Sequence, residues 1–304
     1  MKLDGIATFV TVAECKSLSE AALKLRISRS VVSDRIVELE KELGTSLLQR
    51  TTRKITITED GMEFLQRAIR IVREVEEATA VIAERHGTLA GPLRISAPVT
   101  FGRLHLGPAL YPFLARHPEI GLTLDLNDRR VDAFSDGFDA IIRHGPIQDS
   151  WLVAWTLASS RRVLVAAPAY LAAHGQPTTA AELEGHRGIF YLNRGAGDWR
   201  FGPAGNTTIV HGQAGLVLNN GDMMRDAAVA GLGIALLPQF IASEALQRGE
   251  LVSVDIGIEP EQEFIYIAHR EGQRVSAKLR ALADWLREAF GNPPYWDHSG
   301  DHSA

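Results

Sequence analysis

The chain has 304 residues and a formal net charge of −5 at pH 7, and this length allows two or three domains with their own cores. Its 45% hydrophobic and 23% charged residues are typical of a globular protein, so any nucleic-acid surface has to be local. The single cysteine, Cys15, excludes an internal disulfide framework and favours a reducing compartment. Because a signal-peptide core and a membrane-length apolar stretch are both missing, we expect a cytoplasmic protein without membrane contact.

Residues 3–44 predict three helices. The first has an apolar face of Leu3, Ile6, Phe9, Val10, Val12 and Ala13. Ser17 and Glu20 form a capping box for the second helix, which carries Ala21, Ala22 and Leu25. Ser28 predicts the start of the third helix and Gly44 its end. The buried side of this third helix is expected to hold Val32, Ile36, Leu39 and Leu43.

The outer face of the third helix and the basic hairpin after it predict a DNA-binding surface. Hydroxyls and an arginine at a helix N-terminus are typical of contacts to base edges, and cations on a hairpin are typical of phosphate contacts. A strand at 55–58 would complete the hairpin. Capped amphipathic helices also occur in any helical domain, so helical pattern alone leaves a purely structural role open. The expected DNA contacts are Ser28, Arg29, Ser30, Ser33, Asp34, Arg35, Arg50, Thr52, Arg53 and Lys54.

This order of elements resembles the winged helix-turn-helix of LysR-type transcriptional regulators. The family pattern AA-x-x-L, S-x-x-x-V-S, I-x-x-LE-x-x-LG, L-x-x-R and LT-x-x-G is matched by Ala21, Ala22, Leu25, Ser28, Val32, Ser33, Ile36, Leu39, Glu40, Leu43, Gly44, Leu47 or Leu48, Arg50, Ile57, Thr58 and Gly61. The resemblance implies sequence-specific DNA binding by residues 1–58. Arg26 replaces the glycine common at the turn, so we expect a slightly altered turn. Arg29 and Asp34 also depart from the common residues, which leaves the operator sequence open.

A long helix is predicted from the N-cap Thr58 to about His86. Residues spaced alternately three and four apart form a heptad seam, made of Leu65, Ala68, Val72, Val75, Thr79 and Ile82. A rod of roughly 42 Å with so narrow an apolar stripe needs a partner, which is either a second copy or its own domain. The resemblance implies that residues 59–88 are the linker helix through which these regulators dimerise, giving a homodimer or a homotetramer.

From residue 89 the pattern predicts an α/β domain with a mainly parallel sheet. The expected strands are 93–97, 122–127, 139–143, 163–167, 188–192, 214–219, 233–238 and 264–269, and the expected helices 105–116, 131–136, 168–173, 222–230 and 275–290. Residues 89–291 resemble the two-lobed, periplasmic-binding-protein-like effector domain of the same family. Lobe I would hold about 92–161 and 269–291, and lobe II about 162–268.

The tail at 292–304 is expected to be flexible. Its side chains Asp297, His298, Asp301 and His302 leave a metal site as the less favoured alternative.

Ligands of open α/β sheets lie beyond the carboxyl ends of the strands. This rule selects Val99, Thr100, Phe101, Asn127, Arg143, His144, Tyr191, Asn193, Asn219 and Asp222 as effector-binding candidates. A helix N-terminus near Thr100 and the guanidinium of Arg143 favour a small anion, such as an organic or aromatic acid. The resemblance places the inducer at the loop after the first effector strand, which ranks Thr100, Phe101 and Arg143 first.

Several of these candidates have structural alternatives. Asn219 and Asp222 are equally suited to capping the helix that follows them. Arg143 could be bound by Asp139 or Asp136, and His144 could be an ordinary loop histidine.

The sequence contains no GxSxG, HExxH, P-loop or CxxC motif, so we expect no enzyme activity, cofactor or metal. The predicted fold is a multidomain one, an all-α winged helix-turn-helix with a linker helix followed by an α/β two-lobed domain. The predicted function is a transcriptional regulator that binds double-stranded DNA, a small-molecule effector, itself and, if it activates, RNA polymerase. The alternative is a cytosolic solute-binding protein or enzyme with an N-terminal oligomerisation module.

Overall fold

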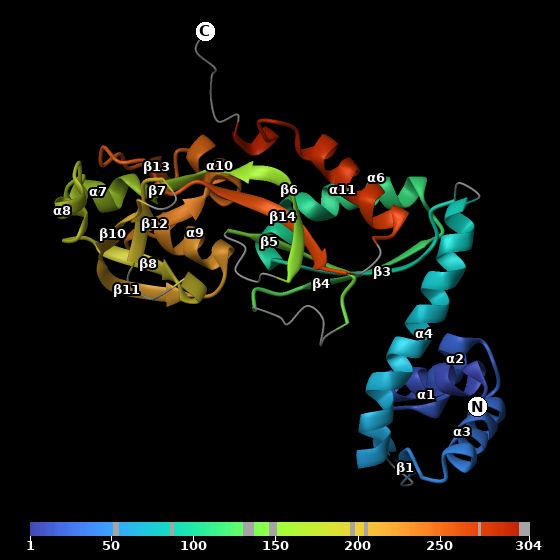
Figure 1. The fold of residues 1–304 in the computed structure, drawn as a ribbon. Helices are drawn as coiled ribbons and strands as arrows, with labels where there is room; N and C mark the ends of the chain where they lie inside the picture. Colours follow the sequence, from blue (N-terminus) through green and yellow to red (C-terminus); the bar gives the residue numbers. More distant parts are fainter. Residues whose placement is uncertain are drawn as a thin grey trace. The chain divides into compact units, whose positions relative to one another are not determined.

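The computed structural model describes residues 1–50, 55–85, 88–129, 137–145, 151–194, 198–203, 206–272 and 275–297. It divides into two compact units, Met1–Gly91 and Pro92–Ala304, whose elements are shown in Figure 1. Among the described residues, no helix combines the length and the apolar character that a membrane crossing requires.

The first unit is built from four helices and a small hairpin. These are α1 (Leu3–Cys15), α2 (Leu18–Leu25), α3 (Arg29–Leu43), β1 (Leu48–Arg50), β2 (Ile55–Ile57) and α4 (Glu59–Arg85). The predicted caps are confirmed: Glu20 N donates to Ser17 Oγ at 3.3 Å and Val31 N donates to Ser28 Oγ at 3.3 Å. The hairpin is antiparallel, with Leu48 opposite Ile57. The predicted starts of α2 and α3 are therefore confirmed.

The turn between α2 and α3 keeps its left-handed residue although it lacks glycine. Arg26 has φ 55° and ψ 39°, and its N–H donates to Leu23 O at 3.2 Å. An L-residue pays about 1–2 kcal/mol for this conformation. The expectation of an altered turn is therefore wrong, because Arg26 adopts the left-handed backbone conformation although it is not a glycine.

The core of the first unit lies between α1, α2, α3 and the start of α4. It includes Phe9, Val12, Ala21, Val32, Ile36, Leu39 and Leu47, all nearly inaccessible. Two predicted core residues lie outside it, since Leu3 is 40% and Leu43 is 36% exposed. Both occupy terminal turns, where the helix extends past the edge of the core.

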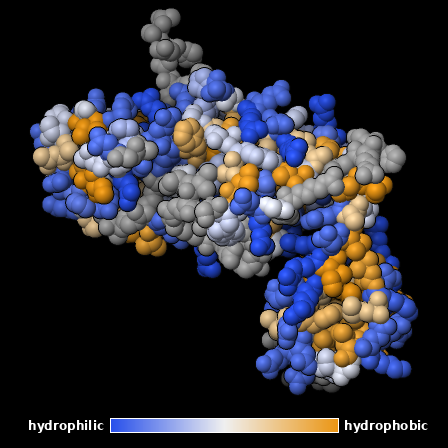
Figure 2. All heavy atoms as spheres, in the orientation of Figure 1, coloured by the Kyte–Doolittle hydropathy of each residue, from blue (hydrophilic) through white to orange (hydrophobic). Residues whose placement is uncertain are grey.

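The linker helix α4 divides into two halves. Leu65, Ala68 and Val72 pack against the core of the first unit, whereas Val75 and Ile82 are 41% and 54% exposed. Figure 2 shows hydrophobic side chains gathered along this helix. The first half of the predicted seam therefore packs on its own domain, and the second half presents an apolar stripe to solvent.

The second unit contains two five-stranded sheets, one in each lobe. Lobe I has the order β4 (Ile120–Leu126), β3 (Gly91–Ala97), β5 (Ala140–His144), β14 (Glu263–Arg270) and β6 (Leu152–Ser160). Lobe II has the order β11 (Gln213–Leu218), β8 (Arg187–Tyr191), β12 (Ile234–Pro238), β7 (Arg162–Ala166) and β13 (Val252–Ser253). A separate hairpin joins β9 (Asp198–Phe201) to β10 (Thr208–His211).

The expectation of mainly parallel sheets is wrong, because both sheets are mixed. β14 runs antiparallel to β5 and β6, and β7 runs antiparallel to β12. The cause is the double crossing of the chain, which leaves lobe I through β6 and re-enters it through β14. The return occurs before Glu263, so β14 belongs to lobe I and the predicted boundary at residue 269 is also wrong.

Helices cover the sheets and connect the strands. They are α5 (Val99–Phe101), the π-helix η1 (Gly102–Leu106), α6 (Gly107–Arg116), α7 (Pro168–His174), α8 (Ala180–Leu183), η2 (Leu192–Arg194), α9 (Gly221–Val229), α10 (Gln239–Gln247), α11 (Ala277–Phe290) and η3 (Tyr295–Asp297). In lobe I, Trp285 Nε1 of α11 donates to Ala109 O of α6 at 2.8 Å. The predicted helix at 131–136 lies outside the described residues.

The start of the tail is packed, contrary to the flexible segment that we expected. Trp296 is 5% exposed, Ser243 Oγ donates to its carbonyl at 2.9 Å, and His105 Nδ1 lies 2.6 Å from Tyr295 Oη. Aromatic burial fixes this segment, because Trp296 contacts Phe101 and Phe240. No group of three metal-ligand side chains occurs among the described residues; His298, Asp301 and His302 lie beyond them.

Candidate functional site

The outer face of α3 exposes the residues that the sequence selects for DNA. Arg29, Ser30 and Asp34 are exposed, and Ser33 is half-buried. Ser28 Oγ and Ser30 Oγ lie 2.8 Å apart at the N-terminus of the helix. The buried residues Val32 and Ile36 lie on the opposite side, so α3 offers an exposed face that is largely polar and also includes Val37.

Arg35, in contrast, is turned toward α1. Its guanidinium donates to Asp4 Oδ2 at 2.7 Å and to Thr8 Oγ1 at 3.4 Å. A second hydrogen bond connects the N-terminal segment to α3, since Lys2 Nζ donates to Glu38 Oε1 at 2.7 Å. In this structure Arg35 holds α3 against α1, and it positions the outer face without belonging to it.

The hairpin is tied to α3 by a carboxylate. Glu40 Oε1 accepts from Leu47 N at 2.8 Å and from Leu48 N at 3.0 Å, which fixes the start of β1. Arg50 ends β1 opposite Ile55. Thr52, Arg53 and Lys54 lie outside the described residues. The start of the hairpin therefore has a fixed position relative to the C-terminal half of α3.

In the second unit, two carboxylates connect the lobes, and we call Asp128 and Asp222 the interlobe carboxylates. Asp222 on α9 accepts from Thr100 Oγ1 at 3.0 Å and from Arg103 Nη2 at 2.7 Å. Asp128 in lobe I accepts from Asn220 Nδ2 at 3.2 Å, and its carbonyl accepts from Asn193 Nδ2 at 2.8 Å. Thr100, Asn193 and Asp222, which the sequence selected separately, are thereby brought together.

Asp128 also occupies the helix start that we predicted as an anion site. Its Oδ1 accepts from Val99 N at 3.0 Å, next to the interlobe contact with Asn220. Asn220 is moreover the cap of α9, since its Oδ1 accepts from Met223 N at 3.1 Å. The capping alternative for Asn219 and Asp222 is therefore wrong, and Asn219 is exposed.

The side chain of Arg143, on β5, contacts the neighbouring strand β3 of lobe I. Its Nη2 donates to Ser96 Oγ at 2.8 Å and its Nη1 to Ile142 O at 2.7 Å. Burial lowers the pKa of its guanidinium below the usual value, and the nearby Tyr266, Asp128 and Asp125 oppose that shift. Asp139 accepts from Arg94 N and makes no ion pair with Arg143 in the described part of the chain; Asp136 lies outside the described residues.

Among the described residues, Phe101 and His144 make no hydrogen bond to the interlobe carboxylates, and both side chains contact Phe240 of α10 in lobe II. Phe101 is 1% exposed and packs edge-on against Phe240 and Phe290, with ring centroids 5.4 and 5.5 Å apart. His144 Nε2 lies 2.9 Å from Glu263 Oε2. Phe101 therefore lies in an aromatic cluster, and its predicted contact with an effector stays a prediction. Asn127, also selected, donates to Asp125.

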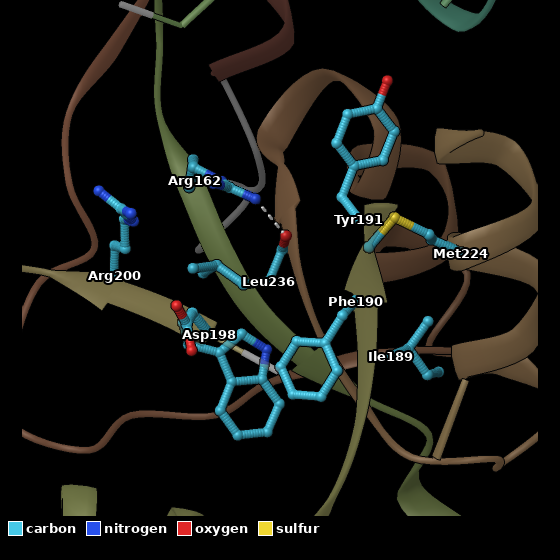
Figure 3. A pocket seen from close by; sticks show the side chains of 9 residues that line it. Arg162, Ile189, Phe190, Tyr191, Asp198, Arg200, Met224 and Leu236 are labelled. Atoms are coloured by element: carbon cyan, nitrogen blue, oxygen red, sulfur yellow. Dashed lines mark hydrogen bonds between the residues drawn. The ribbon is translucent and has the colours of Figure 1, made fainter. Parts of the chain in front are cut away.

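A small pocket opens in lobe II, lined by Arg162, Ile189, Phe190, Tyr191, Asp198, Trp199, Arg200, Met224 and Leu236. Figure 3 shows the Arg162 guanidinium donating to Leu236 O, with Tyr191 and Met224 on the other side. Its volume of ≈ 20 Å³ is enough for a water-sized group. Its lining carries the two arginines together with the carboxylate of Asp198, and Arg162 is already engaged with Leu236 O and Glu263.

Sequence reasoning missed Arg103, Arg162, Arg200 and Met224. Arg103 could have been found from its position one helical turn after Thr100. Arg162 carried a weaker signal, as a charge directly before an apolar strand. Arg200 and Met224 carried none, because they approach the pocket only through tertiary packing.

Comparison with known proteins identifies the chain. Residues 3–62 match the family of bacterial regulatory helix-turn-helix proteins of the lysR family, and residues 86–291 match the LysR substrate binding domain. An uncharacterized HTH-type transcriptional regulator of Haemophilus influenzae is 35% identical over 93% of this chain and 98% of its own length.

Two solved structures are also similar over nearly the whole chain. CrgA, a LysR-type transcriptional regulator from Neisseria meningitidis, has a TM-score of 0.60 and 28% identity, covering 96% of this chain and 100% of that one. The Vibrio cholerae virulence activator AphB has a TM-score of 0.60 and 29% identity, covering 94% and 98%. The chain belongs to the LysR family: it is a transcriptional regulator with a DNA-binding helix-turn-helix domain and an effector-binding domain.

Proposed function

We propose that this regulator binds promoter DNA through the outer face of α3 and the tip of the hairpin, two copies at a time. The observation that carries this proposal is the exposed polar face of α3, which Arg35, Lys2 and Glu40 hold in place from behind. Because this face is already ordered, it can enter a major groove without a further loss of conformational entropy. Its site of action would be the bacterial cytoplasm, and activation would require contact with RNA polymerase.

The second copy is proposed to pack on the outer half of α4. Ile71, Val75 and Ile82 are each more than a third exposed and recur at intervals of four and seven residues, as in a heptad seam. Burial of this stripe would remove apolar surface that a single chain leaves in water. We therefore propose that a helix pair lies between two DNA-binding units, in a homodimer or a homotetramer.

Neutralising the hairpin should weaken binding to every DNA sequence. In an Arg50→Ala, Arg53→Ala double variant, two phosphate contacts are lost in each copy and four in the bound dimer, so the slope of log K against log salt should become shallower by about 3.6. Fluorescence anisotropy at several salt concentrations measures this slope.

Arg248→Ala is the matched control, because Arg248 is an exposed arginine of the second unit paired with Glu244. Its slope should equal that of the wild type. A slope that the double variant leaves unchanged, or a loss confined to one base pair, would contradict phosphate contact by the hairpin.

The effector is proposed to be a small organic acid that enters between the lobes. Thr100, Arg103 and the N–H of Val99 already donate to the interlobe carboxylates, which supports a ligand that carries a carboxylate group. Tyr191, one of the predicted effector-binding residues, lines the lobe II pocket, and so does Met224 of helix α9. An acid that replaces an interlobe carboxylate would change the contact between the lobes, and with it the spacing of the DNA-binding units.

Removing the carboxylate of Asp222 should therefore strengthen the binding of an added organic acid. In Asp222→Asn, Arg103 and Thr100 lose their charged partner, and we expect acids such as benzoate or succinate to bind about fivefold more tightly, a modest effect because Arg103 is solvent-exposed. Isothermal titration calorimetry measures this affinity. Asp226→Asn is the control, since Asp226 lies one turn further on α9 and contacts Arg225 without reaching lobe I. If neither wild type nor Asp222→Asn binds any acid, the proposed ligand class is wrong.

A further inference from the structure

The four carboxylates of α3 differ in what they contact. Glu38 pairs with Lys2 at 2.7 Å, Glu42 with the N-terminal amine of Met1 at 3.1 Å, and Glu40 accepts from the hairpin. Three of the four thus fasten α3 to its own domain. Asp34 is exposed and makes no ion pair or hydrogen bond with any residue that the structure describes. Its negative charge therefore stabilises no contact among the residues that the structure describes.

The position of Asp34 is the centre of the exposed face. It lies two residues after Val32 and two before Ile36, which are both fully buried. Since successive residues of an α-helix are turned by about 100°, the side chain at 34 points almost directly away from the core. Ser30 lies one turn before it, and the half-exposed Val37 follows at 52% exposure. Asp34 therefore lies at the centre of the DNA-binding face proposed above.

A carboxylate at this place is unfavourable unless it finds a donor. DNA phosphates surround the groove with negative charge, and they repel an unpaired Asp. The major-groove edge offers two amino donors, adenine N6 and cytosine N4. Adenine sets the acceptor N7 beside its amino group, whereas cytosine N4 has no acceptor of its own base next to it. Cytosine is therefore the base that compensates a carboxylate at the lowest cost.

We propose that Asp34 reads a cytosine in each half-site of the operator by accepting a hydrogen bond from its N4 amino group. This inference rests on the proposed DNA-binding face and adds to it the residue that selects one base pair. Asp34 thereby also acts against other sequences, because at any base pair without this donor its charge stays unpaired near the phosphates.

The test is a selection from a random duplex library with the full-length wild type, Asp34→Ala and Glu38→Gln, followed by anisotropy on single duplexes. Wild type should select one C·G pair in each half-site, and changing it to T·A should cost about 5- to 150-fold in affinity. Asp34→Ala should bind both duplexes within about twofold while keeping its other preferences. Glu38→Gln removes the same charge from the same helix but keeps a side-chain oxygen that can accept from Lys2 Nζ, so α3 stays in place and the cytosine preference should be kept.

The contrary outcomes are distinct. If Asp34→Ala retains the preference, or raises affinity equally for all duplexes, Asp34 does not read a base. If Glu38→Gln loses the cytosine preference as Asp34→Ala does, helix charge and not a specific contact is responsible. If wild type binds no duplex at all, the DNA-binding face itself fails and the inference falls with it.

Discussion

Gly61→Ala should unfold or displace the DNA-binding unit. A Cβ at Gly61 would lie 2.2 Å from Leu47 O and 2.7 Å from Ile57 Cγ2, and backbone at that distance cannot move aside without moving β1. The first turn of α4 is seated there by Gly61 N, which donates to Thr58 Oγ1 at 3.0 Å. We expect a loss of about 3 kcal/mol, since forcing extra volume into a packed site costs about 1–3 kcal/mol or more.

In a small domain this loss corresponds to a fall in Tm of about 12–24 °C, which scanning calorimetry of the first unit's transition measures. DNA affinity should fall with it, because the hairpin moves with β1. Gly44→Ala is the matched control. A Cβ there meets nothing within 4 Å, and only the backbone angle of φ +72° opposes it, at about 1–2 kcal/mol. Equal effects of the two substitutions would contradict the close approach at Gly61.

Glu263→Gln should destabilise the effector-binding unit. Glu263 is 3% and Arg162 8% exposed, and Arg162 Nη1 lies 3.7 Å from Glu263 Oε1. These two residues begin the strands β14 and β7, which are the two places where the chain crosses between the lobes. Removing one charge of a buried pair costs about 3–5 kcal/mol, because the other charge stays in a poorly solvated place.

Unfolding of the second unit in urea measures this cost. Glu244→Gln is its control, since Glu244 pairs with Arg248 on the surface with both side chains more than 60% exposed, and exposed pairs contribute about 0–1 kcal/mol. A Glu263→Gln variant as stable as Glu244→Gln would show that the buried pair is not needed at the crossings.

The elements that sequence predicted best are those with local causes. Ser17, Ser28 and Gly44 determine the ends of α2 and α3 through hydrogen bonds and backbone angles within a few residues. The strand β6 was missed, because its residues follow no regular alternation of buried and exposed positions and its apolar residues Leu152 to Trp155 are followed by a stretch rich in Thr, Ala and Ser. The helix α10 was missed for a related reason, since it begins directly after Pro238 of the preceding strand.

The candidate site was predictable in part. The strand-end rule selected Thr100 and Asp222, and the two meet although 122 residues separate them. It could not show that Phe101 points into the core, because the direction of one side chain in a short helix depends on the packing of distant aromatics. It could not show Arg35 bound to Asp4 either, since a basic residue on a DNA-binding helix has the same sequence signature whether it faces DNA or its own domain.

The central claim is that the first unit binds one DNA sequence in preference to others, with two copies acting together. The most direct test is an anisotropy titration of the full chain with its own upstream intergenic DNA and with a scrambled duplex, combined with sedimentation of the free protein. The account predicts a dimer or tetramer whose affinity for its own DNA exceeds that for the scrambled duplex by about 10³-fold or more. A monomer that binds both duplexes equally, or neither at low salt, would contradict it.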